Sequence, residues 1–305
     1  MVGIFRNTLR VVGATRPWSF SMTAISVALG ALAAGTLGRI DWWLVVLTLS
    51  GTLCLHAATN LANDYYDYRT GIDTPDSPGV LARHHPLVER TLLPRQVLAG
   101  AIGFWIAAVL IAAVLSLTRG WPIAVLTGVA VLAGFFYSAT PLRLKAWALG
   151  EVTAFIMWGP LMVMGAFFVQ RKTFTGSRQA LVVAVIQGLW VALVLLSNNL
   201  RDKETDAALR IHTPATLLGS GAARALTITL SSAVYLIAIL AVLAGVLGPW
   251  ALLVILSVPL TAKLLVSFYG PQGVPGNAPT QTAQTAMIFG LLLVLSEVLS
   301  LILPF

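Results

Sequence analysis

Charged side chains are scarce in this chain of 305 residues: Asp, Glu, Lys and Arg together make up 10% of it. Soluble globular domains contain about 25% charged residues, so the composition excludes an ordinary soluble domain. Cysteine is scarcer still. The lone Cys54 lies inside an apolar run, which excludes an intramolecular disulfide and is typical of a small core residue.

Long apolar runs take the place of charge. Hydrophobic residues make up 58% of the chain, its mean hydropathy is +0.88, and about 20 mainly apolar residues suffice to cross a bilayer. The runs follow one another closely, so we expect one domain over residues 1–305. It is expected to be an all-α integral membrane protein, a bundle of about nine transmembrane helices around a central cavity open toward the cytoplasmic side. The expected spans are approximately 18–38, 42–62, 97–117, 121–140, 149–170, 180–200, 224–246, 249–269 and 283–303.

Basic residues predict the orientation of these spans. Arg6, Arg10 and Arg16 precede the first run, which is longer than the roughly 7–15 apolar residues of a signal peptide and is expected to be retained. With the N-terminus in the cytoplasm, 14 of the 19 Lys and Arg residues fall on the cytoplasmic side, as the positive-inside rule requires. The net charge of +8 therefore reflects topology, and no nucleic-acid partner is expected.

Acidic residues gather in two segments that each close an apolar run. The segments are Asn60 to Asp73, N-L-A-N-D-Y-Y-D-Y-R-T-G-I-D, and Asn198 to Asp206, N-N-L-R-D-K-E-T-D. Carboxylates at membrane depth are costly and usually functional. The expected orientation places both segments on the cytoplasmic face. Seven of the 11 acidic residues lie in or beside them: Asp64, Asp67, Asp73, Asp76, Asp202, Glu204 and Asp206.

The first segment has the spacing of a helix face. Asn60, Asn63, Asp64 and Asp67 stand at i, i+3, i+4 and i+7, so their side chains share one side. Gly71 is a plausible helix stop. The oxygen ligands favour Mg²⁺ over zinc, because Mg²⁺ takes one or two carboxylates together with waters and substrate phosphates. Arg69 and Asp73, at the end of this segment, are further candidates to contact substrate.

The second segment repeats the pattern. Asn198, Asp202 and Asp206 stand at i, i+4 and i+8 along one helical stripe, with Asn199 to one side. Arg201 and Arg210 supply cations nearby, and two opposed acidic faces suit two Mg²⁺ ions bridged by one pyrophosphate. The alternative is a pair of solvated helix ends whose ion pairs contribute little.

The segment from Tyr137 to Glu151 lies on the same side of the membrane. Tyr137 is a candidate to line the cavity, and Arg143 and Lys145 are candidates to bind phosphate oxygens unless they serve only topology. Glu151 either complements the N-terminal dipole of its helix or contacts an acceptor.

Three other polar residues receive no role. His84 and His85 have no partner at metal-ligand spacing and are treated as loop residues, and Glu297, deep in the last apolar run, is expected to be protonated or paired within the bundle.

The two acidic segments resemble the UbiA superfamily of intramembrane prenyltransferases, whose aspartate-rich motifs lie on helices 2 and 6 of nine. The segments are most similar to the branch that prenylates 1,4-dihydroxy-2-naphthoate in menaquinone biosynthesis. A-L-G-E-V, the pair Gly159 and Pro160, and T-A-M-I-F-G-L-L-L also resemble that branch. The widespread first motif has its next carboxylate where this chain has Tyr68, and Arg210 substitutes for a lysine usual after the second motif.

The resemblance implies an enzyme of the plasma membrane of a prokaryote, with its active site facing the cytoplasm. It implies Mg²⁺-dependent transfer of a polyprenyl group from polyprenyl diphosphate to an aromatic acceptor within membrane lipid, with decarboxylation to demethylmenaquinone if the acceptor is dihydroxynaphthoate. The implied catalytic carboxylates are Asp64, Asp67, Asp202 and Asp206; Asn60 and Asn198 complete the metal ligands; Asn63 assists; and Arg143, Lys145, Arg201 and Arg210 contact the diphosphate.

Two alternatives stay open. A prenyltransferase of the same superfamily acting on 4-hydroxybenzoate, homogentisate, a chlorin or haem has the same motifs. A cation transporter also uses intramembrane carboxylates, but those are expected near helix midpoints.

Overall fold

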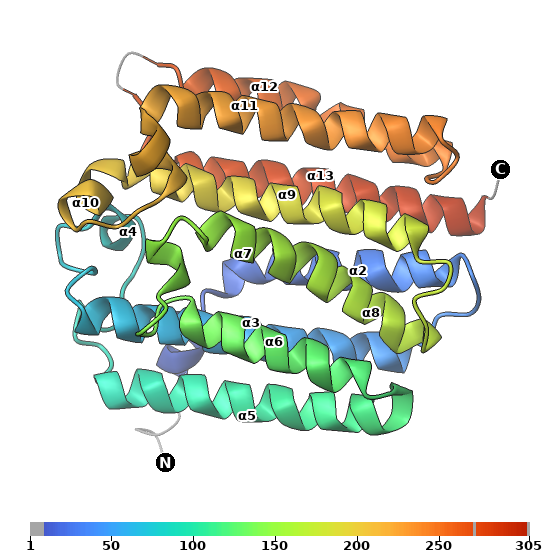
Figure 1. Cartoon of the computed structure of the whole chain (residues 1–305), viewed down its shortest axis with the longest axis horizontal. Coiled ribbons are helices and arrows are strands. Elements are labelled where there is room, and N and C mark those ends of the chain that lie inside the picture. Colours follow the sequence, from blue (N-terminus) through green and yellow to red (C-terminus); the bar gives the residue numbers. More distant parts are fainter. Residues whose placement is uncertain (1–8, 271–272, 304–305) are drawn as a thin grey trace.

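The computed structural model describes residues 9–270 and 273–303, which form helices and one isolated β-bridge but no strand (Figure 1). Arg6, assigned above to the cytoplasmic N-terminus, lies outside the described residues. The elements are η1 (Pro17–Ser19), α2 (Phe20–Gly35), α3 (Trp42–Arg69), α4 (Pro78–Leu81), α5 (Pro94–Arg119), α6 (Pro122–Phe136), η2 (Leu144–Ala146), α7 (Gly150–Ile156), η3 (Met157–Leu161), α8 (Met162–Arg171), α9 (Arg178–Arg201), α10 (Lys203–Ala208), α11 (Pro214–Leu243), η4 (Pro249–Ser257), α12 (Val258–Ser267) and α13 (Ala278–Ile302).

The apolar runs fold into membrane-length helices. In the described part of the chain, eight helical spans are long and apolar enough to cross a membrane, and α6 is a shorter apolar helix. Together they coincide with the nine predicted runs, so the all-α membrane fold is confirmed. Two spans are composite: α7, η3 and α8 form Gly150–Arg171, and η4 and α12 form Pro249–Ser267. The span predicted from residue 224 begins earlier, at Pro214.

The long helices lie side by side with roughly aligned axes (Figure 1). α3 packs along α5, and α9 contacts α7, α11 and α13. α3 and α9 both end at the left of Figure 1, where the short helices α4 and α10 also lie. Both acidic segments are therefore at the same end of the bundle.

The largest hydrophobic core joins α2, α9, α11 and α13. Trp190 of α9 is fully buried and its ring lies 5.4 Å from that of Phe289 of α13, which in turn lies 5.3 Å from Tyr235 of α11. Aromatic pairs at these separations contribute about 0.5–1.5 kcal/mol beyond their burial. α9 is thereby fixed at the centre of the bundle.

α9 also lies very close to the composite span that contains α7. A Cβ on Gly188 would come within 2.6 Å of the carbonyl oxygen of Phe155, so only glycine permits this contact. The neighbouring turn η3 is π-helical and contains Pro160, which cannot donate a backbone hydrogen bond. The close contact sets the start of α7 beside the end of α9.

The end of α3 is defined by its local sequence. Gly71 adopts φ +74°, which is the left-handed conformation that glycine tolerates best, and the predicted helix stop is confirmed. The carbonyl of Asp67 then accepts from the amides of Ile72 (2.9 Å) and Asp73 (3.2 Å). The chain therefore turns back over the helix end and keeps Asp73 close to the acids of α3.

Candidate active site

A cavity of about 1060 Å³ extends from the end of the bundle that carries the acidic segments into its interior. Most of the residues predicted for the site line it. They come from α3, from the segment around η2, and from α9 and α10, which are far apart in sequence. The predicted residues on its surface are Asn60, Asn63, Asp67, Asp73, Tyr137, Lys145, Asn198, Asn199, Arg201, Asp202 and Asp206.

Asp67 is the carboxylate that α3 presents to this cavity. Lys145 Nζ contacts both of its oxygens, and Asn63 donates from Nδ2 to Oδ2 at 2.9 Å. Asn63 Nδ2 also lies 2.7 Å from Ser138 Oγ, which links α3 to the segment that follows α6. Tyr68, at the position of the widespread motif's next carboxylate, packs instead against a hydrophobic cluster with Leu61 and Val97.

Asp64 has a different environment. It is fully buried and is not among the residues that line the cavity. Arg16 pairs with it, and Arg83 donates to it from Nη2 at 2.7 Å and from Nη1 at 3.2 Å. A metal ion reaches Asp64 only if one of these two arginines moves away, so its predicted role as a ligand needs that movement.

The pKa values of these two arginines shift in opposite directions. Burial tends to lower the pKa of Arg16, but the charges of Asp64, Asp73 and Asp67 and the hydrogen bond to Asp64 together raise it. Burial lowers the pKa of Arg83, and the nearby charge of Arg16 lowers it further. Both guanidinium groups belong to one charged cluster around Asp64.

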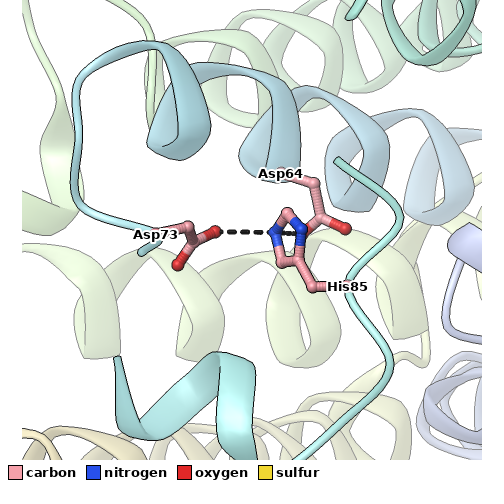
Figure 2. Close-up of side chains that lie close together, drawn as sticks. All are labelled: Asp64, Asp73 and His85. Atoms are coloured by element: carbon pink, nitrogen blue, oxygen red, sulfur yellow. Dashed lines mark hydrogen bonds and ion pairs between the residues drawn. The ribbon is translucent and has the colours of Figure 1, made fainter. Parts of the chain in front are cut away.

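His85 belongs to the same cluster and was not predicted (Figure 2). Its Nε2 lies 2.9 Å from Asp73 Oδ2 and 3.9 Å from Asp64 Oδ1, and its side chain is fully buried. Burial tends to raise the pKa of Asp73, but the hydrogen bond and charge of His85 hold it below its usual value. Treating His85 as a loop residue without a partner was therefore wrong, although the neighbouring His84 is 66% exposed.

The second acidic segment does not form the predicted continuous stripe. α9 ends at Arg201, and Asp202 has φ −90° and ψ 3°, so it joins α9 to the separate short helix α10. Arg201 donates to the Asp202 carboxylate from Nε and Nη2 at 2.6 and 2.7 Å. Asp206 lies on α10 and still reaches the cavity, where burial and the charge of Asp202 raise its pKa to about 7.

Three predicted substrate contacts lie elsewhere. Arg69 and Arg210 are exposed, Arg143 is half-buried, and none of these three described residues lines the cavity. Arg143 and Arg210 have positive φ angles, 42° and 56°, at turns of the connecting segments. Two arginines that were not predicted for the site, Arg16 and Arg83, line the cavity instead.

Deeper in the bundle the cavity wall becomes apolar. It is formed by side chains of α5, α6 and the span containing α8, which are small or aliphatic: Ala108, Ile111, Ala112, Leu115, Ile123, Leu126, Ala130, Ala133, Gly134, Met162, Gly165 and Ala166. The many alanines and glycines leave space that larger side chains would fill. Such a wall accommodates an extended apolar chain.

A polar pair, His56 and Trp158, lies on the cavity wall, and sequence reasoning missed it because it is formed between helices. His56 of α3 lies 2.9 Å from Thr23 Oγ1 and 3.2 Å from Ser19 Oγ. Trp158 donates to Thr23 Oγ1 at 3.1 Å, and its ring lies 4.8 Å from that of His56. The arrangement fixes an imidazole and an indole on the wall.

The chemistry of the donors fits a hard divalent cation. Asp67, Asp202 and Asp206 offer carboxylates to one cavity. Asn60 and Asn198 donate their amide nitrogens to backbone carbonyls, those of Thr15 (2.8 Å) and Val194 (3.1 Å). Their carboxamide oxygens are left for a ligand. Oxygen donors of this kind suit Mg²⁺.

Comparison with known proteins identifies a family of prenyltransferases and similar proteins in it. The model of the UbiA prenyltransferase family matches residues 24–274. A 1,4-dihydroxy-2-naphthoate octaprenyltransferase of Bacillus subtilis is 29% identical over 289 residues, which cover 94% of this chain and 91% of that protein. UbiA prenyltransferase domain-containing protein 1 of Homo sapiens is 32% identical, over 94% of this chain and 82% of its own.

A solved structure shares the fold. It is a UbiA homologue from Archaeoglobus fulgidus bound to DMAPP and Mg²⁺. The two structures superpose with a TM-score of 0.61 at 16% sequence identity, over 93% of this chain and 98% of the other.

Proposed function

This chain belongs to the UbiA prenyltransferase family, and from that membership we propose that it transfers a polyprenyl group from a polyprenyl diphosphate to an aromatic acceptor. The acceptor that we propose is 1,4-dihydroxy-2-naphthoate, which is prenylated with loss of its carboxylate to give the demethylmenaquinone skeleton. The name of the Bacillus subtilis relative supports this choice.

One observation carries the proposal: carboxylates from α3 and from the end of α9 line a single cavity that continues along an apolar wall. The charged end suits a diphosphate with its metal ions, and the apolar wall suits an isoprenoid chain. Neither a solvated helix end nor an ordinary hydrophobic core combines the two.

Asp67, Asp202 and Asp206 are the residues that we propose to hold Mg²⁺, together with the carboxamide oxygens of Asn60 and Asn198. We propose two ions, and Asp64 joins their ligands when Arg16 or Arg83 turns away from it. The Archaeoglobus fulgidus homologue bound to DMAPP and Mg²⁺ supports the choice of metal. Bound Mg²⁺ neutralises the charge that develops on a departing diphosphate.

Cationic side chains of the cavity wall bind the phosphate oxygens in this proposal. Lys145 and Arg201 line the cavity, as do Arg16 and Arg83, and charge-assisted hydrogen bonds to phosphate are short and strong. These four take the role that the family resemblance implied in part for Arg143 and Arg210. Asp73, Tyr137 and Asn199 are proposed to contact substrate from the same wall.

The reaction that follows is an electrophilic substitution. The allylic C–O bond breaks and the diphosphate leaves with the electron pair, while the electron-rich ring carbon forms a bond to the allylic carbon. The electron pair of the bond to the carboxylate returns to the ring as CO₂ departs. The apolar wall keeps bulk water from the allylic cation.

The orientation proposed for the enzyme places its active site on the cytoplasmic face of a prokaryotic plasma membrane. The excess of Lys and Arg at this end of the bundle supports the orientation through the positive-inside rule. A diphosphate donor and a charged aromatic acid then reach the cavity from the aqueous side, and the isoprenoid chain lies within the bilayer.

The experiment that tests the proposal supplies purified protein in liposomes with Mg²⁺, a labelled polyprenyl diphosphate and one acceptor at a time. We expect a prenylated product with 1,4-dihydroxy-2-naphthoate. Product with 4-hydroxybenzoate, homogentisate, a chlorin or haem alone would replace the proposed acceptor. Cation flux through the protein without diphosphate release would overturn the proposed transfer.

A further inference from the structure

A half-buried carboxylate beside the cavity has no part in the mechanism so far. Glu151 lies in the first turn of α7, and its Oε1 accepts from Nδ2 of Asn199 near the end of α9 at 2.7 Å. Its Oε2 is buried and accepts no hydrogen bond from the described residues. The close contact of α9 with the α7–η3 span, at Gly188, keeps these two helix ends together.

The pair fixes which way the Asn199 carboxamide faces. An ionised carboxylate only accepts hydrogen bonds, so the NH₂ group of Asn199 must turn toward Glu151. The carboxamide oxygen then points away from Glu151. Asn199 lines the cavity, and this oxygen accepts no hydrogen bond from any described residue. Glu151 therefore leaves a bare hydrogen-bond acceptor on the cavity surface.

A hydrogen-bond donor stands on the same wall. Tyr137 lines the cavity, and its hydroxyl takes part in no hydrogen bond with the described residues. Burial raises the pKa of Tyr137, and the charges of Glu151 and Asp67 raise it further, so the phenol stays protonated. Gly150 lies beside Tyr137, and its missing Cβ would stand 3.6 Å from the Tyr137 hydroxyl and 3.2 Å from Leu195.

This wall matches a flat ring that carries oxygen substituents. Leu195, Thr153 and the bare backbone of Gly150 offer an apolar surface, and Tyr137 and Asn199 offer one donor and one acceptor. A diphosphate carries only acceptor oxygens, so it cannot donate a hydrogen bond to the Asn199 oxygen. A ring hydroxyl has the hydrogen that this oxygen needs.

We propose that Glu151 is a positioning residue for the aromatic acceptor: it holds the Asn199 oxygen toward the cavity, where that oxygen accepts a hydrogen bond from a ring hydroxyl of the acceptor. The inference rests on the proposed transfer to an aromatic ring, and it assigns the acceptor to the wall formed by Tyr137, Gly150, Leu195 and Asn199. Glutamine cannot replace Glu151, because its NH₂ group allows the Asn199 carboxamide to turn over.

The test compares single and paired substitutions by their KM values for the two substrates. Glu151→Gln is expected to raise the KM for the aromatic acceptor by about tenfold, the effect of one lost hydrogen bond, with the KM for the polyprenyl diphosphate unchanged. The pair Glu151→Gln with Asn199→Asp is expected to recover most of the loss, because the new amide donates to the new carboxylate, whose second oxygen faces the cavity. Asn199→Leu, which leaves Glu151 in place, is expected to match Glu151→Gln.

A control of the same chemical kind lies at the other end of α9. Gln179 donates to the buried Glu297 of α13, and neither residue lines the cavity. Glu297→Gln makes the identical exchange and is expected to leave both KM values unchanged, whatever its effect on thermal stability. This hydrogen bond pairs Glu297 within the bundle, which is one of the two alternatives that the sequence left open.

The outcomes distinguish a failure of the proposed function from a failure of the role assigned to Glu151. An unmodified protein that prenylates no aromatic compound defeats the proposed function. An active unmodified protein defeats the inference alone if Glu151→Gln and Asn199→Leu keep the acceptor KM, if both KM values rise together, or if the paired variant is no better than Glu151→Gln. Should Glu151→Gln fail to fold, Asn199→Leu decides by itself whether the oxygen binds the acceptor.

Discussion

At the scale of single residues, the site is a set of buried carboxylates that the protein's own cations neutralise. Lys145 contacts Asp67, and Arg16 and Arg83 hold Asp64. Unpaired charges are expensive to bury, so these contacts make the acidic cluster tolerable before substrate arrives. In the proposed mechanism, the same cations turn to phosphate oxygens when a diphosphate and its metal ions bind.

Substitution of the carboxylates tests whether they hold Mg²⁺. Asp67→Ala and Asp202→Ala are each expected to lower Mg²⁺-dependent transfer by at least about a hundredfold, since each removes a metal ligand and leaves a cation unpaired. The control is Asp76→Ala, because Asp76 is exposed in the loop after α3 and does not line the cavity. Transfer is measured as labelled product in proteoliposomes. Normal transfer by both cavity variants would show that these acids do not hold the metal.

The pKa of Asp206 predicts a pH dependence. Its value of about 7, raised by burial and by Asp202, means that the carboxyl is protonated below pH 7 and must release its proton to bind Mg²⁺. The Mg²⁺ concentration for half-maximal transfer is therefore expected to rise as the pH falls from about 8 to about 6. In Asp206→Asn, which has no proton to release, the requirement for Mg²⁺ should be higher and should vary less with pH. An equal pH dependence in both proteins would contradict this role.

Sequence reasoning reached the residues whose spacing is local. Asn60, Asn63 and Asp67 line the cavity because three and four residues separate them on one helix. His85 was out of reach, because its partner Asp73 is 12 residues away across a loop whose path no periodicity records. Glu151 was noticed, but its hydrogen bond to Asn199 spans 48 residues and depends on how α7 meets α9.

At the scale of elements, the loop between α3 and α5 covers the acidic end of α3. His85 reaches back from this loop to Asp73 (Figure 2). Arg83, from the same loop, pairs with Asp64. His84, one residue away, lines the cavity but is 66% exposed, and it pairs with the partly exposed Glu89. The loop is therefore fastened at alternate residues, and its charged and imidazole groups belong to the site.

A matched pair of histidine variants tests this attachment. His85→Ala leaves Asp73 without its partner, at a cost of about 1–3 kcal/mol, and is expected to speed tryptic cleavage at Arg83 or Arg90 by about tenfold. His84→Ala is expected to be cleaved at the rate of the unmodified protein. Cleavage is followed by gel electrophoresis of protein in detergent. Equal rates for the two variants would mean that His85 does not hold the loop.

The elements themselves were predicted well where apolar length decided them. The nine apolar runs all became helices, eight of which are long enough to cross a membrane within the described residues, because the bilayer demands internally satisfied backbone hydrogen bonds. The break at Asp202 was not predicted, since Asn198, Asp202 and Asp206 fit a continuous helix equally well. The break turns α10 aside and still leaves Asp206 on the cavity wall.

At the scale of the whole molecule, one cavity of the bundle combines a charged end with an apolar wall. Its charged end is formed by α3, α9 and the loops, and its apolar wall by α5, α6 and the α8 span. The fold was predictable from hydropathy, but the shared cavity depends on which faces of distant helices meet. That meeting is a tertiary property, and only the structure displays it.

Orientation in the membrane is also a property of the whole chain. With Cys54 replaced by serine, a single cysteine placed at Asp76 or at Thr175 reports one end of the bundle each; both positions are exposed, in the loops after α3 and α8. The proposed cytoplasmic orientation of the site predicts that Thr175→Cys reacts with a membrane-impermeant maleimide on intact cells, and that Asp76→Cys reacts only after lysis. The reverse pattern would invert the proposed topology.

The most direct measurement is a crystal structure of the protein with Mn²⁺ in place of Mg²⁺ and a non-hydrolysable polyprenyl thiodiphosphate. The account predicts anomalous density between Asp67 on α3 and the pair Asp202 and Asp206, with the diphosphate bridging the two sides and its chain lying along α5 and α6. Density bound to one acidic segment alone, or a diphosphate outside the cavity, would contradict it.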